Sequence, residues 1–288
     1  MEIKKGGEIM IPFDFEYNKP DSLSDAIKMY KNFSLMNKEP LYYSGGTEII
    51  TMARENKIST KAVIDIKGIP ECTVFEVNNN KLIIGAAVTL TDVSESKFFS
   101  LLSDTARFPA DHTARNKITT VGNICGNIIY KEAILGHLVA DSSVIIYGEN
   151  GNRILPINLA FNKKIQIEKG EFVSQLVVDM SYSQLPYVCV KKTKQGIGGY
   201  PLISMAALKK NGNIQMAFSG LCEFPFRSKS MEEAINNKSI SKDKRIEKAI
   251  KHLPAPILGD IQGSAEYRKF VLINILQDTL AILDGGEK

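Results

Sequence analysis

The sequence predicts an α+β protein, in which a two-lobed domain is followed by a smaller C-terminal domain. Three observations predict this class. Short apolar, β-forming runs alternate with helical patterns, turns rich in Asn and Gly separate neighbouring strand patterns, and helical patterns dominate after the last of these turns. With 288 residues, 44% of them hydrophobic, the chain can bury a substantial core. We expect domains at residues 1–182 and 183–288.

The first lobe is expected over residues 1–66. Ser22 can cap a helix that begins near Leu23, with Asp25 at the third helical position in an arrangement like a capping box. Short buried strands are expected at Leu41–Tyr43 and Ala62–Ile66, on either side of a turn that contains two glycines.

The second lobe is expected over residues 67–182. Asn78-Asn79-Asn80 separates the strand patterns Thr73–Val77 and Lys81–Gly85, and a helical pattern runs from Asp92 to Phe108. A second hairpin turn is expected at residues 148–152, and a strand at residues 175–180 closes the lobe.

The C-terminal domain is expected to begin near residue 183. Asn211-Gly212-Asn213 gives the clearest hairpin turn of the chain, between strand patterns at residues 202–209 and 214–220. Helical patterns then follow at Met231–Asn236, Lys242–Lys251 and Ala265–Leu283. This part has few polar clusters, and by itself it indicates no chemistry.

The composition excludes several classes of function. A net charge of +4, with 24% charged residues, gives no basic stripe for nucleic acid. No apolar run reaches the roughly 18 residues of a membrane span, and the first residues lack the apolar core of a secretory signal. We therefore expect a cytoplasmic protein that binds neither nucleic acid nor membranes. No metal site is expected, because the histidines are dispersed and no zinc or iron–sulfur spacing joins Cys72, Cys125, Cys189 and Cys222.

One segment points to a bound phosphate. In it a β-forming run ends at a Gly-Gly pair, and a hydroxyl and a carboxylate that can open a helix follow. Glycine lets the backbone approach a ligand closely, and consecutive N–H groups before a helix form a cradle for an anion. A Gly-Gly pair at such a place is more often only a turn, and that alternative stays open. The segment consists of Tyr42, Tyr43, Ser44, Gly45, Gly46, Thr47, Glu48 and Ile49.

A second polar segment with glycine follows about 70 residues later, between Arg115 and Asn127. It could form a second phosphate cradle, and the two together fit a diphosphate. The chain has no GxGxxG pattern, which argues against a nicotinamide-binding Rossmann unit. The residues expected to contact the ligand are Thr119, Thr120, Val121, Gly122 and Asn123.

In this order and spacing, the two segments resemble the motifs of the FAD-binding subunits of the xanthine dehydrogenase and carbon monoxide dehydrogenase group of molybdenum hydroxylases. Members of that family typically carry Ala-Gly-Gly-Thr-Asp first and Arg-Asn-x-x-Thr-x-Gly-Gly-Asn second. Residues 12–30, 63–70, 84–91 and 263–269 resemble further stretches of the family. The resemblance therefore covers nearly the whole chain.

The resemblance implies a two-lobed FAD-binding domain of the PCMH type (vanillyl-alcohol-oxidase-like), followed by a C-terminal α+β domain of the CO dehydrogenase flavoprotein type. FAD would lie between the lobes, with its pyrophosphate at the two glycine segments. Glu132, Leu176 and Lys191 align with family positions that contact the flavin nucleotide. The alternatives are a surface carboxylate for Glu132, an ordinary buried strand residue for Leu176 and a solvated basic edge for Lys191.

Some positions depart from the family pattern. Val121 stands where relatives have the first glycine of a pair, and valine resists positive φ and adds bulk where the backbone should approach phosphate. Ile128 and Ile129 replace a Ser-Pro turn. Glu132 replaces an aspartate, so its carboxylate is carried on a side chain one methylene longer.

The resemblance implies an oxidoreductase subunit that passes electrons from a [2Fe–2S] subunit through FAD to NAD or another acceptor, beside a subunit that carries the molybdenum cofactor. Such electron transfer needs no acid, base or nucleophile, so no catalytic residue is assigned. The departures at Val121, at Ile128-Ile129 and at Gly199, where relatives usually have an aspartate, favour an alternative, in which the chain binds flavin weakly or not at all and serves as a structural or assembly subunit. A stand-alone flavin oxidase or reductase is a third reading, for which the sequence offers no substrate-binding cluster.

Overall fold

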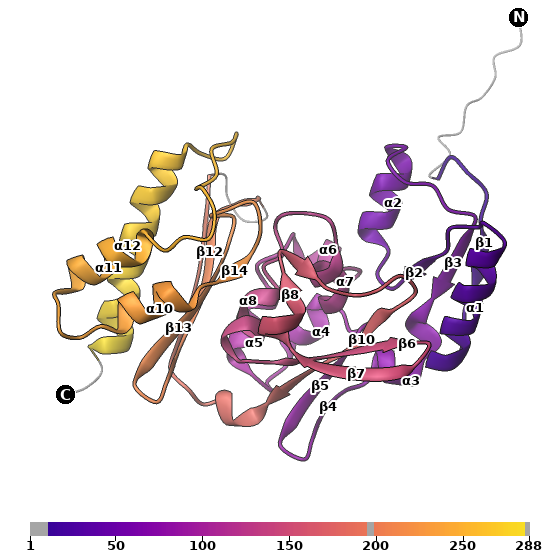
Figure 1. The fold of residues 1–288 in the computed structure, drawn as a ribbon, viewed down its shortest axis with the longest axis horizontal. Coiled ribbons are helices and arrows are strands. Elements are labelled where there is room, and N and C mark those ends of the chain that lie inside the picture. The colour runs from indigo at the N-terminus through magenta and orange to yellow at the C-terminus, as the bar shows by residue number, and fades with distance from the viewer. Residues whose placement is uncertain (1–10, 195–198, 286–288) are drawn as a thin grey trace, which may run out of the picture.

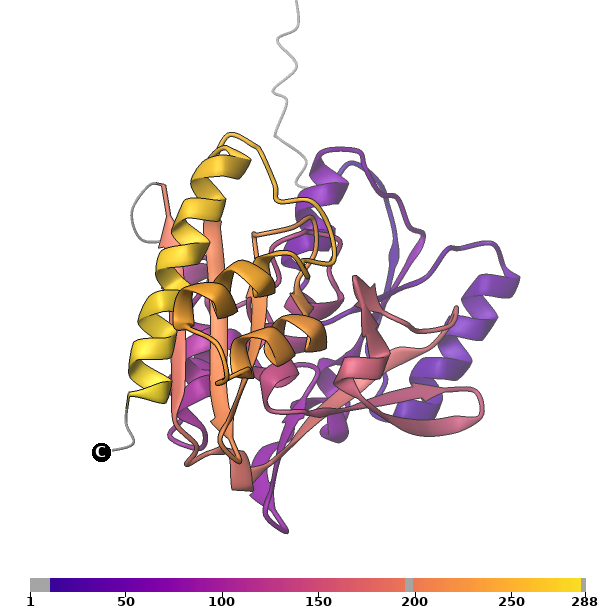
Figure 2. The same cartoon turned by 60° about the vertical axis from the view of Figure 1, so that its left-hand side comes forward.

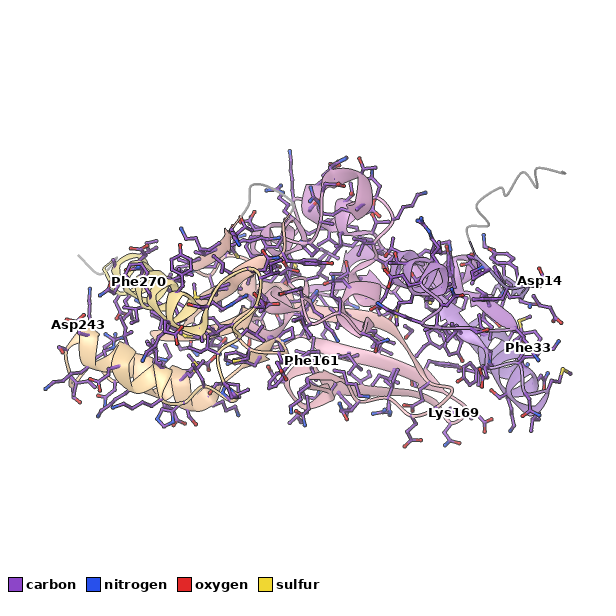
Figure 3. All side chains as sticks on the ribbon, turned by 90° about the horizontal axis from the view of Figure 1, so that it is seen from above. Asp14, Phe33, Phe161, Lys169, Asp243 and Phe270 are labelled. Carbon is purple, nitrogen blue, oxygen red and sulfur yellow. The ribbon has the colours of Figure 1, made fainter. Side chains whose placement is uncertain are left out.

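The computed structural model describes residues 11–194 and 199–285. Within these residues, three main sheets follow one another along the chain, beside a two-stranded hairpin (Figure 1). Seen from above, Asp14 and Phe33 lie towards one end of an elongated molecule, and Asp243 and Phe270 towards the other (Figure 3). The expected domain boundary at residue 182 falls between the second and third sheets, and the division into domains stays a prediction.

The first sheet is parallel, with the strand order β1-β3-β2. Helix α1 begins as predicted, because the side chain of Ser22 accepts a hydrogen bond from the backbone amide of Asp25. The strand predicted to end at Ile66 ends at Asp65, whose side chain caps a 3₁₀ turn over Ile66–Gly68. The elements are β1 (Glu16–Asn18), α1 (Leu23–Leu35), β2 (Leu41–Tyr43), α2 (Thr47–Arg54) and β3 (Ala62–Asp65).

The second sheet has five antiparallel strands in the order β4-β5-β10-β6-β7. They are β4 (Phe75–Asn78), β5 (Lys81–Gly85), β6 (Ser143–Gly148), β7 (Gly151–Pro156) and β10 (Phe172–Asp179). Around them lie α3 (Pro70–Thr73), α4 (Leu90–Glu95), α5 (Ser100–Ala106), α6 (His112–Arg115), α7 (Thr120–Cys125), α8 (Ile134–Val139), α9 (Ile157–Ala160), the small hairpin β8 (Phe161–Asn162) and β9 (Lys164–Ile165), and a 3₁₀ turn at Met180–Tyr182.

Two boundaries in this lobe differ from the prediction. The strand expected from Thr73 begins only at Phe75, because Pro70 favours the start of a short helix that takes up Thr73. The helical pattern over residues 92–108 forms two helices, since the backbone becomes extended at Ser96. The hydroxyl of Ser103 donates to the carbonyl of Ser96 over 3.0 Å and holds α5 against the end of α4.

The third sheet is antiparallel and has the order β11-β12-β13-β14. Its central hairpin turns at Asn211 and Gly212, both with positive φ, as the sequence predicted. Helices α10 to α12 cover one face, and α8 of the second lobe packs on the other (Figures 1 and 2). The elements are β11 (Tyr187–Thr193), β12 (Pro201–Lys210), β13 (Asn213–Ser219), β14 (Phe226–Arg227), α10 (Lys229–Asn236), α11 (Lys242–Ile250) and α12 (Ala265–Asp284).

The strands of this third sheet serve two hydrophobic cores. Along β12, Ala206 and Leu208 belong to the core shared with the first two sheets, whereas Met205 and Ala207 belong to the core beneath α10–α12. This alternation follows from the two-residue period of a strand. The C-terminal sheet is thus packed tightly against the second lobe. None of the helices in the described residues is long and apolar enough to cross a membrane.

Candidate cofactor-binding site

The first glycine segment is a sharp turn from β2 into α2. Gly46 caps the helix with φ +71° and ψ −2°, a left-handed conformation that favours glycine. A Cβ atom on Gly46 would lie 2.1 Å from the ring of Tyr43, which packs over the turn. Both the backbone angle and the close ring therefore require glycine here.

This turn leaves a row of hydrogen-bond donors unused. Within the described residues, the N–H groups of Gly45, Gly46, Thr47 and Glu48 donate to no protein acceptor. They stand at the amino end of an eight-residue helix, where the helix dipole adds to the attraction for an anion. The segment has the donors that the sequence led us to expect of a phosphate cradle.

Tyr43 and Ile49 of this segment face the first lobe. They line a largely apolar cavity of about 320 Å³ between α2 and the first sheet. At one side of this cavity Asp65 accepts hydrogen bonds from Tyr17 and Lys67. Burial raises the pKa of Asp65, but the hydrogen bonds from Lys67 and Tyr17 lower it by more. The pKa therefore lies below its ordinary value.

Tyr42 instead joins the first lobe to the second. Its hydroxyl donates to the carbonyl of Gly170 over 2.8 Å, and its ring lies 5.0 Å from that of Tyr30 and 4.5 Å from that of Phe172. Burial raises the pKa of Tyr42, so the phenol stays protonated and keeps this hydrogen bond.

The second glycine segment opens helix α7. The Thr119 side chain accepts a hydrogen bond from the Gly122 amide at 3.1 Å, and a Cβ on Gly122 would lie 2.6 Å from that hydroxyl. The Thr120 hydroxyl is buried and has no hydrogen-bond partner among the residues that the structure describes. Asn123 accepts from the Ala133 amide at 3.3 Å and so holds the start of α8.

The expected obstruction at Val121 is wrong. Val121 lies inside α7, has no positive φ and is only 6% exposed, with its side chain in the core of the second lobe. The side chain therefore points into the core and not towards solvent. No left-handed conformation is required at this position, because the loop enters a helix instead of making a glycine turn.

The two glycine segments touch each other directly. The hydroxyl of Ser44 donates to that of Thr119 over 3.1 Å and also contacts the carbonyl of Ala86. A Cβ on Gly45 would lie 2.0 Å from the carbonyl oxygen of Lys117. The glycine at position 45 thus allows the backbones of the two lobes to meet.

Glu48 ties the lobes together next to this contact. Its carboxylate accepts hydrogen bonds from the amides of Asn127, at 2.8 Å, and Ile128, at 3.1 Å. Gly126 makes room for it, since a Cβ there would lie 2.6 Å from a Glu48 oxygen. The carboxylate is therefore engaged by protein donors, and only the Glu48 amide is free for a ligand.

Glu132 and Lys191 meet between the second lobe and the C-terminal sheet. Lys191 Nζ lies 3.2 Å from Glu132 Oε1 and also donates to the carbonyl of Phe108. Their side chains are 3% and 14% exposed. The alternatives of a surface carboxylate and a solvated basic edge are both wrong, because the two groups are buried against each other.

Leu176 lies in the middle of β10, paired with Ile84 and Val144 and 1% exposed. The core of the second lobe accounts for its burial, and its contact with a cofactor stays a prediction.

Two features were missed by the sequence analysis. Lys131 is 3% exposed, carries its ammonium 5.8 Å from the centre of the Phe161 ring, and has its pKa lowered chiefly by burial. The apolar residues on both sides of Lys131 and Glu132 were the available signal. Tyr130 stacks on Tyr200 of the C-terminal part, with the ring centres 4.7 Å apart, and donates to Asp260. Nothing local in the sequence predicts that pairing.

The described residues contain no group of three or more His, Cys, Asp and Glu side chains that could hold a metal ion. The polar chemistry of the site thus consists of backbone donors, hydroxyls and one buried ion pair. Such a set can bind and orient a nucleotide, and it offers no activated nucleophile.

Comparison with known proteins agrees with this reading. Residues 13–178 match the family model described as the FAD binding domain in molybdopterin dehydrogenase. The chain is 26% identical over 282 residues to the glyceraldehyde dehydrogenase medium chain of Sulfolobus acidocaldarius, covering 91% of this chain and 96% of that protein. It is 23% identical over 245 residues to the carbon monoxide dehydrogenase medium chain of Hydrogenophaga pseudoflava, covering 81% and 84%.

Solved structures show the same fold. A carbon monoxide dehydrogenase from Hydrogenophaga pseudoflava that lacks the Mo-pyranopterin moiety of its cofactor superposes with a TM-score of 0.84, over 96% of this chain and 99% of that one, at 21% identity. Quinoline 2-oxidoreductase from Pseudomonas putida 86 gives a TM-score of 0.83 at 18% identity, with the same coverage. The predicted α+β class and FAD-binding fold are confirmed.

Proposed function

This chain belongs to the family of FAD-binding domains of molybdopterin dehydrogenases, and we propose that it is the electron-transferring FAD subunit of a molybdenum hydroxylase. An FAD cofactor and an oxidoreductase role come with the family. The proposal adds the route: from a [2Fe–2S] subunit, through FAD, to NAD or another acceptor. Bound FAD supplies the redox chemistry of that route, and the chain supplies binding, orientation and docking.

The observation that carries the proposal is the row of unused donors from Gly45 to Glu48. A pyrophosphate needs backbone N–H groups without partners of their own, at a place where the main chain is accessible. Here such donors stand at the start of α2 and next to the Thr119 segment of the other lobe. The donor set fits a diphosphate that is held where the two lobes meet.

Glu132 and Lys191 are proposed to act further along the same nucleotide. Glu132 would accept a hydrogen bond from a ribose or ribityl hydroxyl, and Lys191 would bring positive charge towards the ring. Their ion pair holds both side chains in one geometry, with the Phe108 carbonyl as a third contact. A preorganised pair loses less entropy on binding than two free side chains.

The nature of the nucleotide tests the proposal first. The purified chain is expected to retain FAD and not FMN, because the unused donors from Gly45 to Glu48 lie where the two lobes meet and so suit a diphosphate. The amides of Thr120 and Gly122 donate to protein acceptors, so the second segment does not form the second phosphate cradle that the sequence led us to expect. The bound nucleotide can be released by denaturation and identified by chromatography. FMN alone, or no flavin after incubation with excess FAD, would refute the proposal and favour the structural-subunit alternative.

Glu132 gives a graded test. A hydrogen bond to a charged group contributes about 1.5–3 kcal/mol, so Glu132→Gln should weaken FAD binding several-fold. Glu233→Gln is a suitable control, because Glu233 is an exposed carboxylate on α10, in the C-terminal part and away from both glycine segments. Equal FAD affinities for the two variants would show that Glu132 serves only the ion pair.

The proposed partners require a separate experiment. Coexpression of a tagged chain with the [2Fe–2S] and molybdenum-cofactor subunits of its host should yield a stable complex. Flavin reduction after addition of the substrate that the complex hydroxylates can then be followed by stopped-flow absorbance. A complex that assembles without flavin would support a purely structural role, and recovery of neither subunit would count against electron transfer.

A further inference from the structure

Helix α8 is fastened to the C-terminal sheet at both of its ends. Two residues before it, Glu132 pairs with Lys191 of β11. At its other end, the Leu138 carbonyl and the Asp141 carboxylate bind Arg227 of β14. Strands β11 and β14 are the two edges of the sheet, and α8 packs across β12, β13 and β14. One short helix therefore connects the proposed flavin-site pair with a second ion pair at the far edge.

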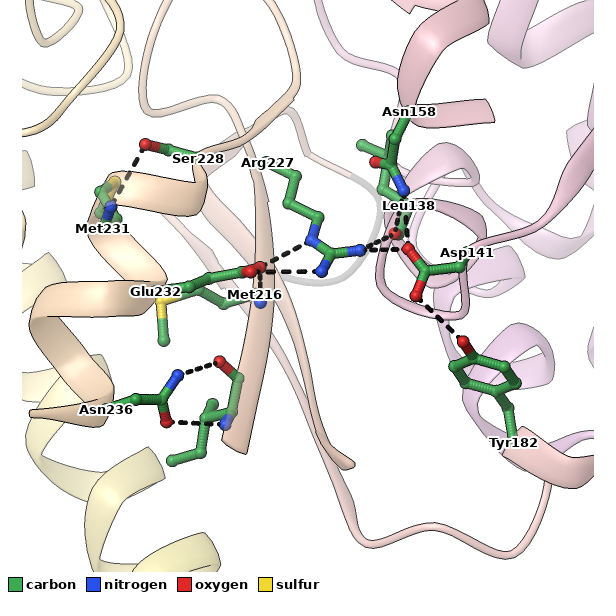
Figure 4. Close-up of polar contacts among 11 residues, drawn as sticks. Leu138, Asp141, Asn158, Tyr182, Met216, Arg227, Ser228, Met231, Glu232 and Asn236 are labelled. Carbon is green, nitrogen blue, oxygen red and sulfur yellow. Dashed lines mark hydrogen bonds and ion pairs between the residues drawn. The ribbon is translucent and has the colours of Figure 1, made fainter. Parts of the chain in front are cut away.

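Arg227 is the central group of that second contact (Figure 4). Its Nη1 lies 2.8 Å from the Leu138 carbonyl and 2.6 Å from Asp141 Oδ1, while its Nε lies 2.6 Å from Glu232. Glu232 is itself held by the Met216 amide at 2.9 Å. Only 9% of the Arg227 side chain is exposed. A desolvated guanidinium with charged partners on both sides gives a strong, directional contact.

The second-lobe side of the contact is equally fixed. Asp141 has φ +48° and accepts a hydrogen bond from the Tyr182 hydroxyl at 3.0 Å and one from Asn158 at 2.9 Å. Tyr182 belongs to the segment that connects the second sheet to the third, and Lys210 of β12 contacts its hydroxyl. The end of α8 is thus bound to the edge strand and to the connection between the two parts.

Between these two ends the interface is uncharged. His137, on α8, is 1% exposed, and burial lowers its pKa to about 3. It is therefore neutral at physiological pH. The α8 face packs on alanine and leucine side chains of the sheet, which make no directional contacts with it. The directional contacts that hold the helix on the sheet are the polar ones at its two ends.

We propose that Arg227 is a positioning residue for the cofactor site. By holding the C-terminal end of α8 on β14, it keeps Glu132 at the other end aligned with Lys191. The helix has six residues, about 9 Å of rigid rod, so a tilt at one end moves the other. The inference rests on the proposed function in one respect, namely that Glu132 and Lys191 contact FAD. Arg227 itself would not touch the cofactor.

The test compares two buried arginines. Arg227→Met keeps the aliphatic stem and removes every polar contact. Arg245→Met is the matched control, because Arg245 is buried, pairs with Asp284 at 2.8 Å and binds the Ile235 carbonyl, all within the C-terminal part. FAD affinity is measured by fluorescence titration, and folding by thermal unfolding. Arg227→Met should weaken FAD about five-fold or more, whereas Arg245→Met should lower only the unfolding temperature. Equal effects of both on FAD would overturn the proposal.

A double-mutant cycle with Glu132→Gln identifies the route. If Arg227 acts through Glu132, Arg227→Met should cost little further affinity once Glu132 is replaced. An equal cost in both backgrounds would overturn the proposal. Asp141→Asn, which leaves the Leu138 contact in place, is the milder companion variant and should give a smaller loss of affinity in the same direction. Failure of the unaltered chain to bind FAD would refute the proposed function, whereas normal FAD binding by Arg227→Met refutes only this inference.

Discussion

Replacing Gly45 by alanine should separate the two glycine segments. The added Cβ would lie 2.0 Å from the carbonyl oxygen of Lys117 and 3.2 Å from the Thr119 amide. Both are backbone atoms, so no side-chain rotation can relieve the contact. An ordinary contact begins near 3.4 Å, and the two backbones must therefore move apart by about 1.4 Å. Overpacking of this kind costs about 1–3 kcal/mol.

The same displacement should impair cofactor binding. It pulls on the 3.1 Å hydrogen bond between Ser44 and Thr119 and on the 2.8 Å bond from the Asn127 amide to Glu48. The proposed donors then no longer fit one pyrophosphate. We expect FAD affinity to fall about tenfold or more, which corresponds to about 1.4 kcal/mol. The unfolding temperature should fall by roughly 2–10 °C.

Gly259→Ala is the control for this variant. Gly259 has no positive φ, and its nearest neighbour to an added Cβ lies at 3.7 Å, which is ordinary contact. Both proteins are titrated with FAD by flavin fluorescence and melted with and without the cofactor. If Gly45→Ala binds FAD within about twofold of Gly259→Ala, the lobe contact at Gly45 does not shape the cofactor site.

Three further outcomes are expected. Gly46→Val should abolish FAD retention, because the new side chain clashes with Tyr43. In the control Gly212→Ala, φ is +77° and no atom lies within 4 Å of the added Cβ, so only backbone strain of about 1–2 kcal/mol is expected. Equal FAD binding by the two variants would refute this prediction. Val121→Gly should destabilise the fold by about 2–4 kcal/mol without raising FAD affinity, because the Val121 side chain lies in the core. A tenfold gain in FAD affinity would instead show that the Val121 side chain obstructs the cofactor. Burial lowers the pKa of His137 in the folded protein to about 3, against about 6.5 in the unfolded chain. As the pH falls from about 6.5 towards 3, only the unfolded chain binds the proton, so the free energy of unfolding falls by up to about 1.4 kcal/mol per pH unit. Chemical denaturation across that range should give a flatter profile for His137→Gln, and identical profiles would contradict the burial argument.

The sequence predicted the local features well where a few adjacent residues determine them. The Ser22 cap and the turn at Asn211-Gly212 formed as expected, because a cap and a two-residue turn depend on the backbone angles and hydroxyls of their own residues. The helix predicted over residues 92–108 was wrong in its continuity. Its break at Ser96 is held by Ser103, a contact that the helical pattern does not contain.

For the candidate site, the sequence identified the correct segments but not what each side chain does there. It indicated a phosphate cradle at Gly45 and Gly46, and their amides donate to no acceptor in the described part of the chain. It could not show that the Glu48 carboxylate binds the amides of the other lobe, or that Val121 points into the core. Those outcomes depend on which way a short helix faces once the lobes have packed.

By itself the sequence indicated the family, the cofactor class and the main hairpins and helices, because glycine spacing, caps and turns depend on contiguous residues. Only the tertiary structure decided the partners. Glu132 pairs with Lys191, and Arg227 with Asp141, across the junction of the second lobe and the C-terminal sheet. The physical reason is that a buried charge takes the partner that packing brings within reach, and that choice is made by elements far apart in the chain.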